Sequence, residues 1–196
     1  MRVSRAQVAD NRRKILEAAS RLFRARGFEA VTVAEIMKAA GLTHGGFYGH
    51  FKSKDDLIAQ SLAHVLAAGS RAEPDLAAYA GRYLSPRHRD DLAGGCPVAA
   101  LGAEIVRHGP EARAAMTAGL RRQIELLSRS ARGSDRSEKR RAAIGSWAAM
   151  VGAVILARLS DDPQLSDEVL VQTRAWIDNQ ESRPRGADGR TASLRT

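Results

Sequence analysis

The first part of the chain places apolar residues at helical spacing between polar capping residues. Ser4 and Gln7 form an S-x-x-Q capping pattern, and Gly27 stands where a helix commonly stops. Between them the apolar positions recur three and four residues apart, at Ile15, Leu16, Ala19, Leu22 and Phe23. This pattern predicts an amphipathic helix that begins after Ser4 and ends at Gly27.

Two further capped segments follow directly. Thr32 and Glu35 form a capping box that opens a short helix over 33–40, and Gly41 ends that helix. Thr43 can cap the next helix, so only Gly-Leu-Thr separates the two helices. Two short helices joined by such a turn predict a helix-turn-helix.

The segment after this turn, THGGFYGHF over 43–51, contains three glycines. Glycine weakens a helix by about 0.5–1 kcal/mol relative to alanine, so packing must offset its poor propensity. If the segment is an α-helix, Phe47 and Phe51 share one buried face, whereas Gly45 and Tyr48 lie on other faces. We interpret the glycines as removing side-chain bulk where a DNA duplex approaches, which predicts a recognition helix.

The rest of the chain is also patterned as helices and lacks β-branched runs, so the predicted fold class is all-α. Ser53 and Asp56 cap a fourth helix that runs toward Ala68. After a break at Pro74 we expect helices over 75–84, 97–107, 110–132 and 142–159, and a last helix over 167–180 capped by Ser166. Between them we expect a polar loop over 85–95 and a charged connection over 133–139, and at the end a disordered tail over 181–196.

Positive charge is concentrated at the front of the chain. The net charge is +9, and residues 1–64 hold 11 Lys and Arg against 6 Asp and Glu, whereas residues 65–180 hold 16 against 14. Four basic residues crowd the first half of the first helix: Arg5, Arg12, Arg13 and Lys14. A basic N-terminal segment followed by a nearly neutral one favours an N-terminal domain that binds a polyanion. The alternative is that the basic surface serves solubility alone.

Several other classes of site are not indicated. His44 and His50 are six residues apart, whereas metal-binding pairs on a helix are spaced by three or four, so we expect no metal and no cofactor. We find no nucleotide-binding or catalytic motif and expect no enzyme. No stretch approaches the roughly 18 uncharged apolar residues of a membrane span, and the N-terminus lacks an apolar signal core. We therefore expect a cytoplasmic protein without a membrane partner.

These motifs resemble those of a known family. The stretch TVAEIMKAAGLTHGGFYGHFKSKDDL is similar in order and spacing to the signature of the TetR family of bacterial transcriptional regulators. The resemblance covers about residues 10 to 60 and implies an N-terminal, three-helix DNA-binding domain. It implies phosphate contacts by Thr32, Tyr48, His50 and Lys52, and it implies that Thr43, His44 and Gly45 face bases.

The two late helices favour a homodimer. Helix 142–159 carries the small residues Gly145, Ala148, Ala149, Gly152 and Ala153 beside Ile144, Val151 and Ile155. The last helix adds Val169, Leu170, Thr173, Trp176 and Ile177. Small residues allow helices to approach closely, and small DNA-reading modules commonly need two half-sites about one helical turn apart. The pattern predicts a two-fold four-helix interface, with the core of a monomer as the alternative.

Cys96 is the only cysteine, which excludes an internal disulfide. One interpretation is a small, partly apolar core residue. The other is a reactive thiol, because Cys96 stands at a predicted helix N-terminus with Arg87, His88 and Arg89 upstream. A catalytic thiol is not supported, since no general base or oxyanion arrangement accompanies it.

We predict a dimeric transcriptional regulator with a DNA-binding domain over 1–53 and a helical effector-binding and dimerisation domain over 54–180. In the favoured mechanism a small-molecule effector tilts helices and releases a repressor from an inverted-repeat operator. Two alternatives stay open: a constitutive DNA-binding protein without an effector, and a redox or electrophile sensor acting through Cys96. The candidate ligand-binding residues, for each of which core packing is the alternative, are Tyr79, Tyr83, Cys96, Leu101, Met116, Leu120, Trp147 and Met150.

Overall fold

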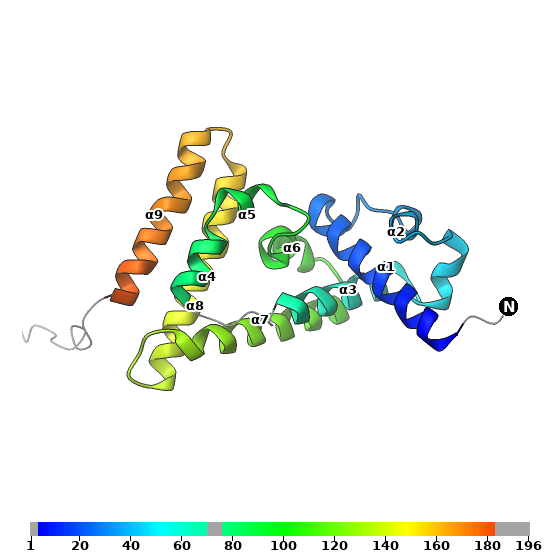
Figure 1. Ribbon diagram of the computed structural model, residues 1–196, viewed down its shortest axis with the longest axis horizontal. Helices are drawn as coiled ribbons and strands as arrows, with labels where there is room; N and C mark the ends of the chain where they lie inside the picture. The colour runs from blue at the N-terminus through cyan, green and yellow to red at the C-terminus, as the bar shows by residue number, and fades with distance from the viewer. Residues whose placement is uncertain (1–3, 70–75, 183–196) are drawn as a thin grey trace, which may run out of the picture. The chain divides into compact units, whose positions relative to one another are not determined.

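The computed structural model describes residues 4–69 and 76–182, and all regular secondary structure in these ranges is helical (Figure 1). The predicted all-α fold is confirmed. The elements are α1 (Arg5–Arg26), α2 (Val33–Ala39), the 3₁₀ helix η1 (His44–Gly49), α3 (Lys54–Gly69), α4 (Leu76–Tyr83), α5 (Pro86–Asp90), α6 (Pro97–Ile105), α7 (Pro110–Ser130), α8 (Arg136–Leu159) and α9 (Pro163–Ser182).

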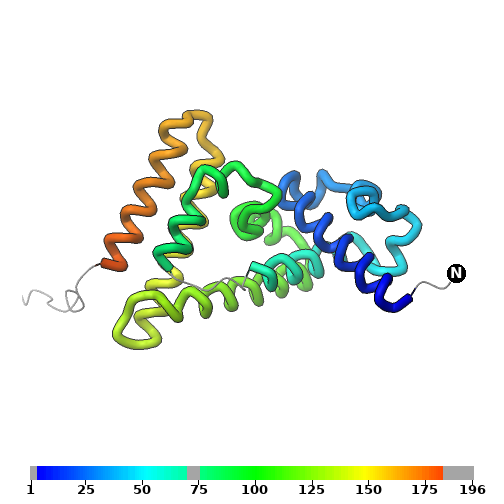
Figure 2. Tube along the Cα trace, viewed as in Figure 1, coloured from blue at the N-terminus to red at the C-terminus, as the bar shows by residue number. Residues whose placement is uncertain are grey.

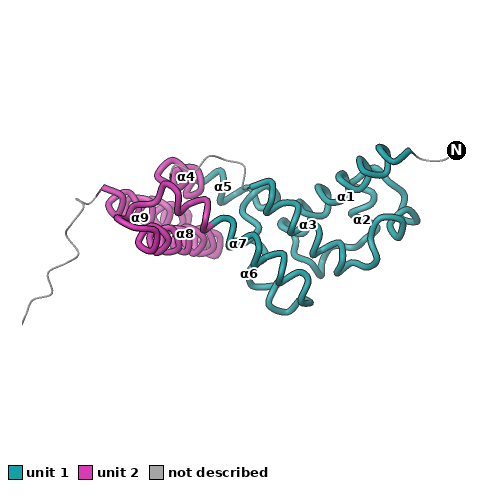
Figure 3. Tube along the Cα trace, turned by 90° about the horizontal axis from the view of Figure 1, so that it is seen from below, with its two compact units in different colours: residues 1–73, 86–123 teal, residues 74–85, 124–196 magenta. Residues whose placement is uncertain are grey.

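Packing divides the chain into two compact units (Figure 3). Unit 1 comprises Met1–Glu73 with Pro86–Gln123, and unit 2 comprises Pro74–Ser85 with Ile124–Thr196. In unit 1, α6 contacts both α1 and α3. The helix-turn-helix and α6 are therefore packed as one body, although the functional division after residue 53 stays a prediction.

The core of unit 1 is closed and strongly apolar. Fully burying a large apolar side chain contributes about 1.5–3 kcal/mol, so this cluster is large enough to hold a poor helix former such as η1 in place. Side chains from α1, α2, η1, α3, α6 and α7 meet in it, and its members include Ile15, Phe23, Phe28, Ile36, Met37, Phe47, Phe51, Leu57, Ile58, Leu62, Leu101 and Met116.

Polar bonds fix both ends of α6 to α1 and the turn that follows α1. At one end the Arg24 guanidinium donates to the Gly95 carbonyl at 3.1 Å, and burial lowers the pKa of Arg24. At the other end the Phe28 amide donates to the Glu104 carboxylate at 2.8 Å. Gly27 has φ +81°, and a Cβ there would lie 2.7 Å from a Glu104 oxygen. The close approach of Glu104 therefore requires glycine at this position.

Unit 2 is built on the pairing of α8 with α9, which lie side by side (Figure 2). Helix α4 contacts both of them. Trp147 and Met150 of α8 and Leu170 and Ile177 of α9 are buried. The buried Ser166 hydroxyl donates to the Ala157 carbonyl at 2.7 Å, which adds a polar tie between the two helices.

Several helix boundaries differ from the sequence expectation: α4, α6 and α7 are two residues shorter than expected, and larger differences occur elsewhere. The expected polar loop over 85–95 contains the short helix α5, and the expected connection over 133–139 contains the start of α8, because Asp135 caps that helix through the Glu138 amide at 2.9 Å. Pro74 and residues 183–196 of the expected tail lie outside the described residues.

The expected cap of the last helix was also wrong. Asp162 accepts a hydrogen bond from the Gln164 amide at 2.8 Å, so α9 begins at Pro163 instead of after Ser166. Proline suits the first position of a helix, because its missing N–H has no partner there. Ser166 lies inside the helix and bonds to α8.

Helix α8 corrects the expectation that no stretch of the chain approaches the length of a membrane span. Within the ranges that the structure describes, α8 is the one helix long and apolar enough to cross a membrane by length and composition. Of its most apolar window, 39% is buried against the rest of the chain. The core helix of a soluble protein can have the same length and composition.

Candidate nucleic-acid interface

The capping box at the start of α2 is formed as predicted. The Glu35 amide donates to the Thr32 hydroxyl at 3.2 Å, and the Thr32 amide donates to the Glu35 carboxylate at 2.8 Å. The bond from the Thr32 backbone, followed by that from Arg26, lowers the pKa of Glu35 to about 2. Thr32, a predicted phosphate contact, is therefore exposed but held in the cap.

The turn between the two helices is also as predicted. Gly41 has φ +71°, a left-handed conformation that favours glycine. The Gly41 amide donates to the Lys38 carbonyl at 3.0 Å, and the Leu42 amide donates to the Met37 carbonyl at 2.9 Å. These bonds satisfy carbonyls at the end of α2 and reverse the chain toward Thr43.

The segment after the turn is a 3₁₀ helix, so the expected α-helix was wrong. Three glycines leave η1 with little intrinsic helix propensity, and short 3₁₀ runs are common where an α-helix cannot be sustained. Thr43 stands at the N-cap but makes no side-chain capping bond, contrary to expectation. The Gly46 amide bonds instead to the Thr43 carbonyl at 3.1 Å.

The residues of this segment that we expected to be buried or exposed are nonetheless so in the structure. Phe47 and Phe51 are buried with stacked rings, whose centroids lie 5.8 Å apart. Tyr48 is 75% exposed. The other predicted DNA contacts in this stretch are exposed or, for His50, half-exposed: Thr43, His44, Gly45, His50 and Lys52. The segment is thus anchored from below by two aromatic rings and presents polar groups and backbone outward.

The fold itself does not need glycine at two positions in η1. A Cβ built on Gly45 or Gly49 meets nothing within 4 Å. At Gly46 it would make ordinary contact with the end of the Met37 side chain, at 3.7 Å. Steric conflict inside the chain therefore does not explain the glycines at 45 and 49.

The loop that leads from η1 to α3 is fixed by two hydrogen bonds of Asp56. The Asp56 amide donates to the Ser53 hydroxyl at 3.1 Å, as the predicted cap requires. The Asp56 carboxylate in turn accepts from the Lys52 amide at 2.9 Å. That backbone bond, then the bond from Gln60, lowers the pKa of Asp56. The position of the Lys52 backbone is thereby set by α3.

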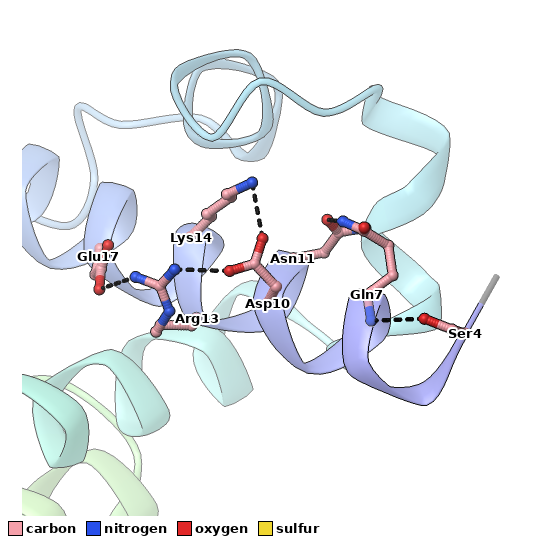
Figure 4. Close-up of polar contacts among 7 residues, drawn as sticks. All are labelled: Ser4, Gln7, Asp10, Asn11, Arg13, Lys14 and Glu17. Atoms are coloured by element: carbon pink, nitrogen blue, oxygen red, sulfur yellow. Dashed lines mark hydrogen bonds and ion pairs between the residues drawn. The ribbon is translucent and has the colours of Figure 1, made fainter.

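The basic residues of α1 are less available than the sequence suggested (Figure 4). Arg13 bonds to Asp10 at 2.6 Å and to Glu17 at 2.8 Å, and Lys14 bonds to Asp10 at 2.8 Å. The bonds from Lys14 and then Arg13 lower the pKa of Asp10. Part of the charge on this helix is therefore neutralised within the helix.

The predicted cap of α1 is half formed (Figure 4). The Gln7 amide donates to the Ser4 hydroxyl at 3.1 Å, as expected. The Gln7 side chain, however, donates to Asn11 at 2.8 Å and does not return to the cap. A glutamine has a partner one turn ahead as well as one behind, and the sequence pattern alone does not select between them.

The candidate ligand-binding residues are divided between the two units. Tyr79 and Tyr83 lie in unit 2 with ring centroids 5.7 Å apart, and Trp147 and Met150 are buried in the same unit. Leu101 and Met116 belong to the core of unit 1, and the partly buried Leu120 packs against that core. Their role as ligand contacts stays a prediction.

A cavity of about 460 Å³ lies at the corner between α7 and α8 in unit 2, and none of the candidate ligand-binding residues lines it. Its lining is polar and charged, which does not suit an apolar effector. The lining residues are Glu125, Ser128, Arg129, Ser134, Asp135, Arg136, Lys139 and Arg140. Among residues 4–69 and 76–182, no group of three or more His, Cys, Asp and Glu side chains is placed to hold a metal ion.

Cys96 stands at the N-cap of α6 and is half-buried. Its side chain makes no capping bond, and its amide donates to the His88 ring nitrogen at 2.9 Å. Pro97 occupies the first position of the helix, as predicted. The position of the thiol is thus as the sequence predicts, and its reactivity stays a prediction.

The predicted dimer face is exposed in part. Ala153, Leu170 and Ile177 are buried inside unit 2 and belong to the core of the protomer, because α9 packs against α8. A Cβ at Gly145 or Gly152 meets nothing within 4 Å. The apolar side chains that α8 and α9 leave exposed are Ile144, Ile155, Leu156, Leu159, Leu165, Val171 and Trp176.

Comparison with known proteins places these features in a family. Residues 15–60 match the model of the bacterial regulatory proteins of the tetR family, and residues 72–173, more than half of the chain, match that of the tetracyclin repressor-like C-terminal domain. The crystal structure of Escherichia coli NemR in its reduced form superimposes with a TM-score of 0.74 at 25% identity, covering 90% of this chain and 99% of that one.

Two curated relatives differ in how much they cover. The HTH-type transcriptional regulator AcrR of Shigella flexneri is 41% identical over 59 residues, which are 30% of this chain and 27% of AcrR. The repressor NemR of Escherichia coli K12 is 29% identical over 133 residues, 62% of this chain and 67% of NemR. The chain thus spans less than a third of AcrR and about two thirds of NemR. With both of its parts matched by family models, the chain belongs to the TetR family of bacterial regulatory proteins.

Proposed function

We propose that this protein is a sequence-specific DNA-binding repressor that acts as a homodimer on an inverted-repeat operator. The observation that carries the proposal is the exposed segment 43–52, whose polar groups and glycines stand on a closed apolar core behind a fully formed capped turn. In the assignment we propose, Thr32, Tyr48, His50 and Lys52 contact phosphates, and the base-facing positions are Thr43, His44 and Gly45. A bacterial repressor acts in the cytoplasm, where the chromosome lies.

The second part of the proposal is a dimer formed through α8 and α9. These helices expose Ile144, Ile155, Leu159 and Trp176, which are costly to leave in water. The space beside Gly145 and Gly152 supports the close approach of a partner helix. A two-fold arrangement of two helices from each subunit covers this face and pairs two DNA-reading segments.

The third part is release by a small-molecule effector. The match to the tetracyclin repressor-like C-terminal domain supports an effector site in the helices after residue 72. Unit 2 offers the neighbouring rings of Tyr79 and Tyr83 and the buried Trp147 as aromatic contacts. The proposed effector is therefore an organic molecule with an apolar body.

Selection from a random duplex library tests the first part. We expect the recovered sequences to share an inverted repeat with half-site centres about 34–36 Å apart along the duplex. Lys52→Ala should weaken binding to every duplex by a similar factor and reduce the slope of log affinity against log salt by about 0.9, the value for one lost phosphate contact. Thr43→Ala should change the preferred bases.

Arg136→Ala is the matched control, because Arg136 is basic and 88% exposed but lies in unit 2. It should leave both the salt slope and the recovered sequence unchanged. A library that returns no shared inverted repeat with the unmodified protein would exclude the sequence-specific assignment.

A further inference from the structure

The most connected basic residue near the proposed interface is Arg12, which is half-buried on α1. Its guanidinium donates to the His50 carbonyl at 2.7 Å. The same group lies over the Phe51 ring, with its central carbon 4.6 Å from the ring centroid. Arg12 thus holds the backbone carbonyl of the residue that directly follows η1, 38 residues along the chain from itself.

The other terminal nitrogen of the guanidinium donates to the Gln60 side-chain oxygen. Gln60 in turn donates to Asp56 at 2.6 Å, and Asp56 accepts from the Lys52 amide at 2.9 Å. A continuous polar path therefore leads from Arg12 through α3 to the Lys52 backbone. Together with the direct bond to His50, the path fixes the loop on both sides of Phe51.

We infer that Arg12 is a positioning residue for DNA binding, which orients the His50–Lys52 loop instead of contacting phosphate itself. This inference rests on the proposed function, because His50 and Lys52 are proposed phosphate contacts. The guanidinium is suited to the task, since it presents planar donors along two edges and stacks on an aromatic face. A lysine at this position keeps the charge but has neither the two-edged geometry nor the planar face.

The geometry separates Arg12 from its neighbours in α1. Arg13 and Lys14 bond to carboxylates on their own helix, and exposed pairs of that kind contribute little. Arg12 instead bonds to an uncharged carbonyl and an uncharged amide in other elements. Its positive charge is partly desolvated against Phe51, where it strengthens both bonds.

The test measures affinity of the full-length protein for the duplex that selection returns, in a cycle of single and double variants. Arg12→Lys should weaken binding by about tenfold or more, because a charge-assisted contact and the stacking geometry are lost. Gln60→Ala, which removes no charge, should weaken binding severalfold. In a Lys52→Ala background the loss from Arg12→Lys should shrink to about threefold or less, since one of the two proposed phosphate contacts that Arg12 positions is gone and only His50 remains.

Two results would overturn the inference. If Arg12→Lys binds within about twofold of the unmodified protein while Arg12→Met lowers the salt slope by about 0.9, Arg12 is itself a phosphate contact. If the losses from Arg12→Lys and Lys52→Ala multiply, Arg12 has only a general structural role. If circular dichroism shows that Arg12→Lys is unfolded, the Gln60→Ala variant takes its place. The inference is then tested by whether the loss of affinity from Gln60→Ala shrinks in the Lys52→Ala background. Failure of the proposed function gives a different result, because the unmodified protein would then recover no specific duplex in the selection.

Discussion

The two units of this protein each bury an apolar core but leave different kinds of surface exposed. In unit 1 the exposed part of the segment over 43–52 consists of backbone, hydroxyl, imidazole and ammonium groups above two buried phenylalanines. In unit 2 the exposed part of α8 and α9 includes Leu156, Leu159 and Trp176. The difference fits the two proposed partners, a duplex for the first surface and a second copy of the chain for the second.

Glycine has the same steric role on both surfaces. Gly45 and Gly49 on the first, and Gly145 and Gly152 on the second, have open space where a Cβ would stand. Gly27 is the contrast, because a side chain there would collide with Glu104. Open space beside a glycine does not by itself mark a contact, since Gly69 and Gly102 have it too. On the two proposed surfaces, however, it marks positions where we expect another molecule to come close, and substitution there separates folding from function.

The largest expected effect is that of Gly152→Leu. A Cβ at Gly152 meets nothing within 4 Å inside the chain, so the variant should fold, whereas a leucine on the close-approach face should separate the subunits. Loss of paired binding should lower operator affinity by about 100-fold or more. Sedimentation at micromolar concentration measures the first effect, and gel-shift titration measures the second.

Gly102→Leu is the control for this variant, because Gly102 on α6 also has no neighbour within 4 Å of a Cβ but lies outside α8 and α9. It should remain dimeric. An unmodified protein that sediments as a monomer at that concentration would remove the basis for the α8–α9 interface.

Gly45→Ala should have an intermediate effect and should move stability and affinity in opposite directions. Alanine has the better helix propensity, so the free energy of unfolding should stay the same or rise by up to about 1 kcal/mol. Affinity for the selected duplex should fall by roughly tenfold, because a methyl group then occupies the space of the duplex. Gly69→Ala, on an exposed glycine at the end of α3, should leave affinity unchanged. Equal affinity of Gly45→Ala and the unmodified protein would refute the close approach of DNA at this position.

The smallest effect concerns the capping box of α2. The pKa of Glu35 is lowered from 4.5 to about 2, so the carboxylate contributes stability that is complete above about pH 4.5 and is lost as the pH falls toward 2. Glu35→Gln should therefore be less stable than the unmodified protein near neutral pH, and the difference should narrow on acidification. Urea unfolding at a series of pH values measures it. A difference independent of pH would mean that the carboxylate charge has no part in the cap.

The sequence predicted those features that local chemistry decides. The Thr32–Glu35 box, the stop at Gly27 and the turn at Gly41 each depend on residues within four positions of one another, and all three are present. The burial of Phe47 and Phe51 also followed from their spacing.

Features that depend on distant partners could not be read from the chain. The 3₁₀ form of η1 results from a balance between its glycines and its tertiary packing, which spacing does not report. The charge of Arg12 was visible, but its bond to the His50 carbonyl joins residues far apart in sequence. The sequence pointed to Ser166 as the cap of the last helix, but the Ser166 hydroxyl bonds to the Ala157 carbonyl of α8, and Asp162 accepts from the Gln164 amide at the true start of α9.

The bonds between α6 and α1 have a consequence for the exchange of modules between regulators of this kind. A chimera that joins residues 1–53 of this protein to the C-terminal part of another regulator would contain Arg24 and Phe28 but would lack Glu104 and the Gly95 carbonyl. The recipient would then have to supply a carboxylate opposite the Phe28 amide and a small residue at the Gly27 turn. A chimera that keeps these bonds therefore has to take two separate segments of this chain, the N-terminal helices and α6.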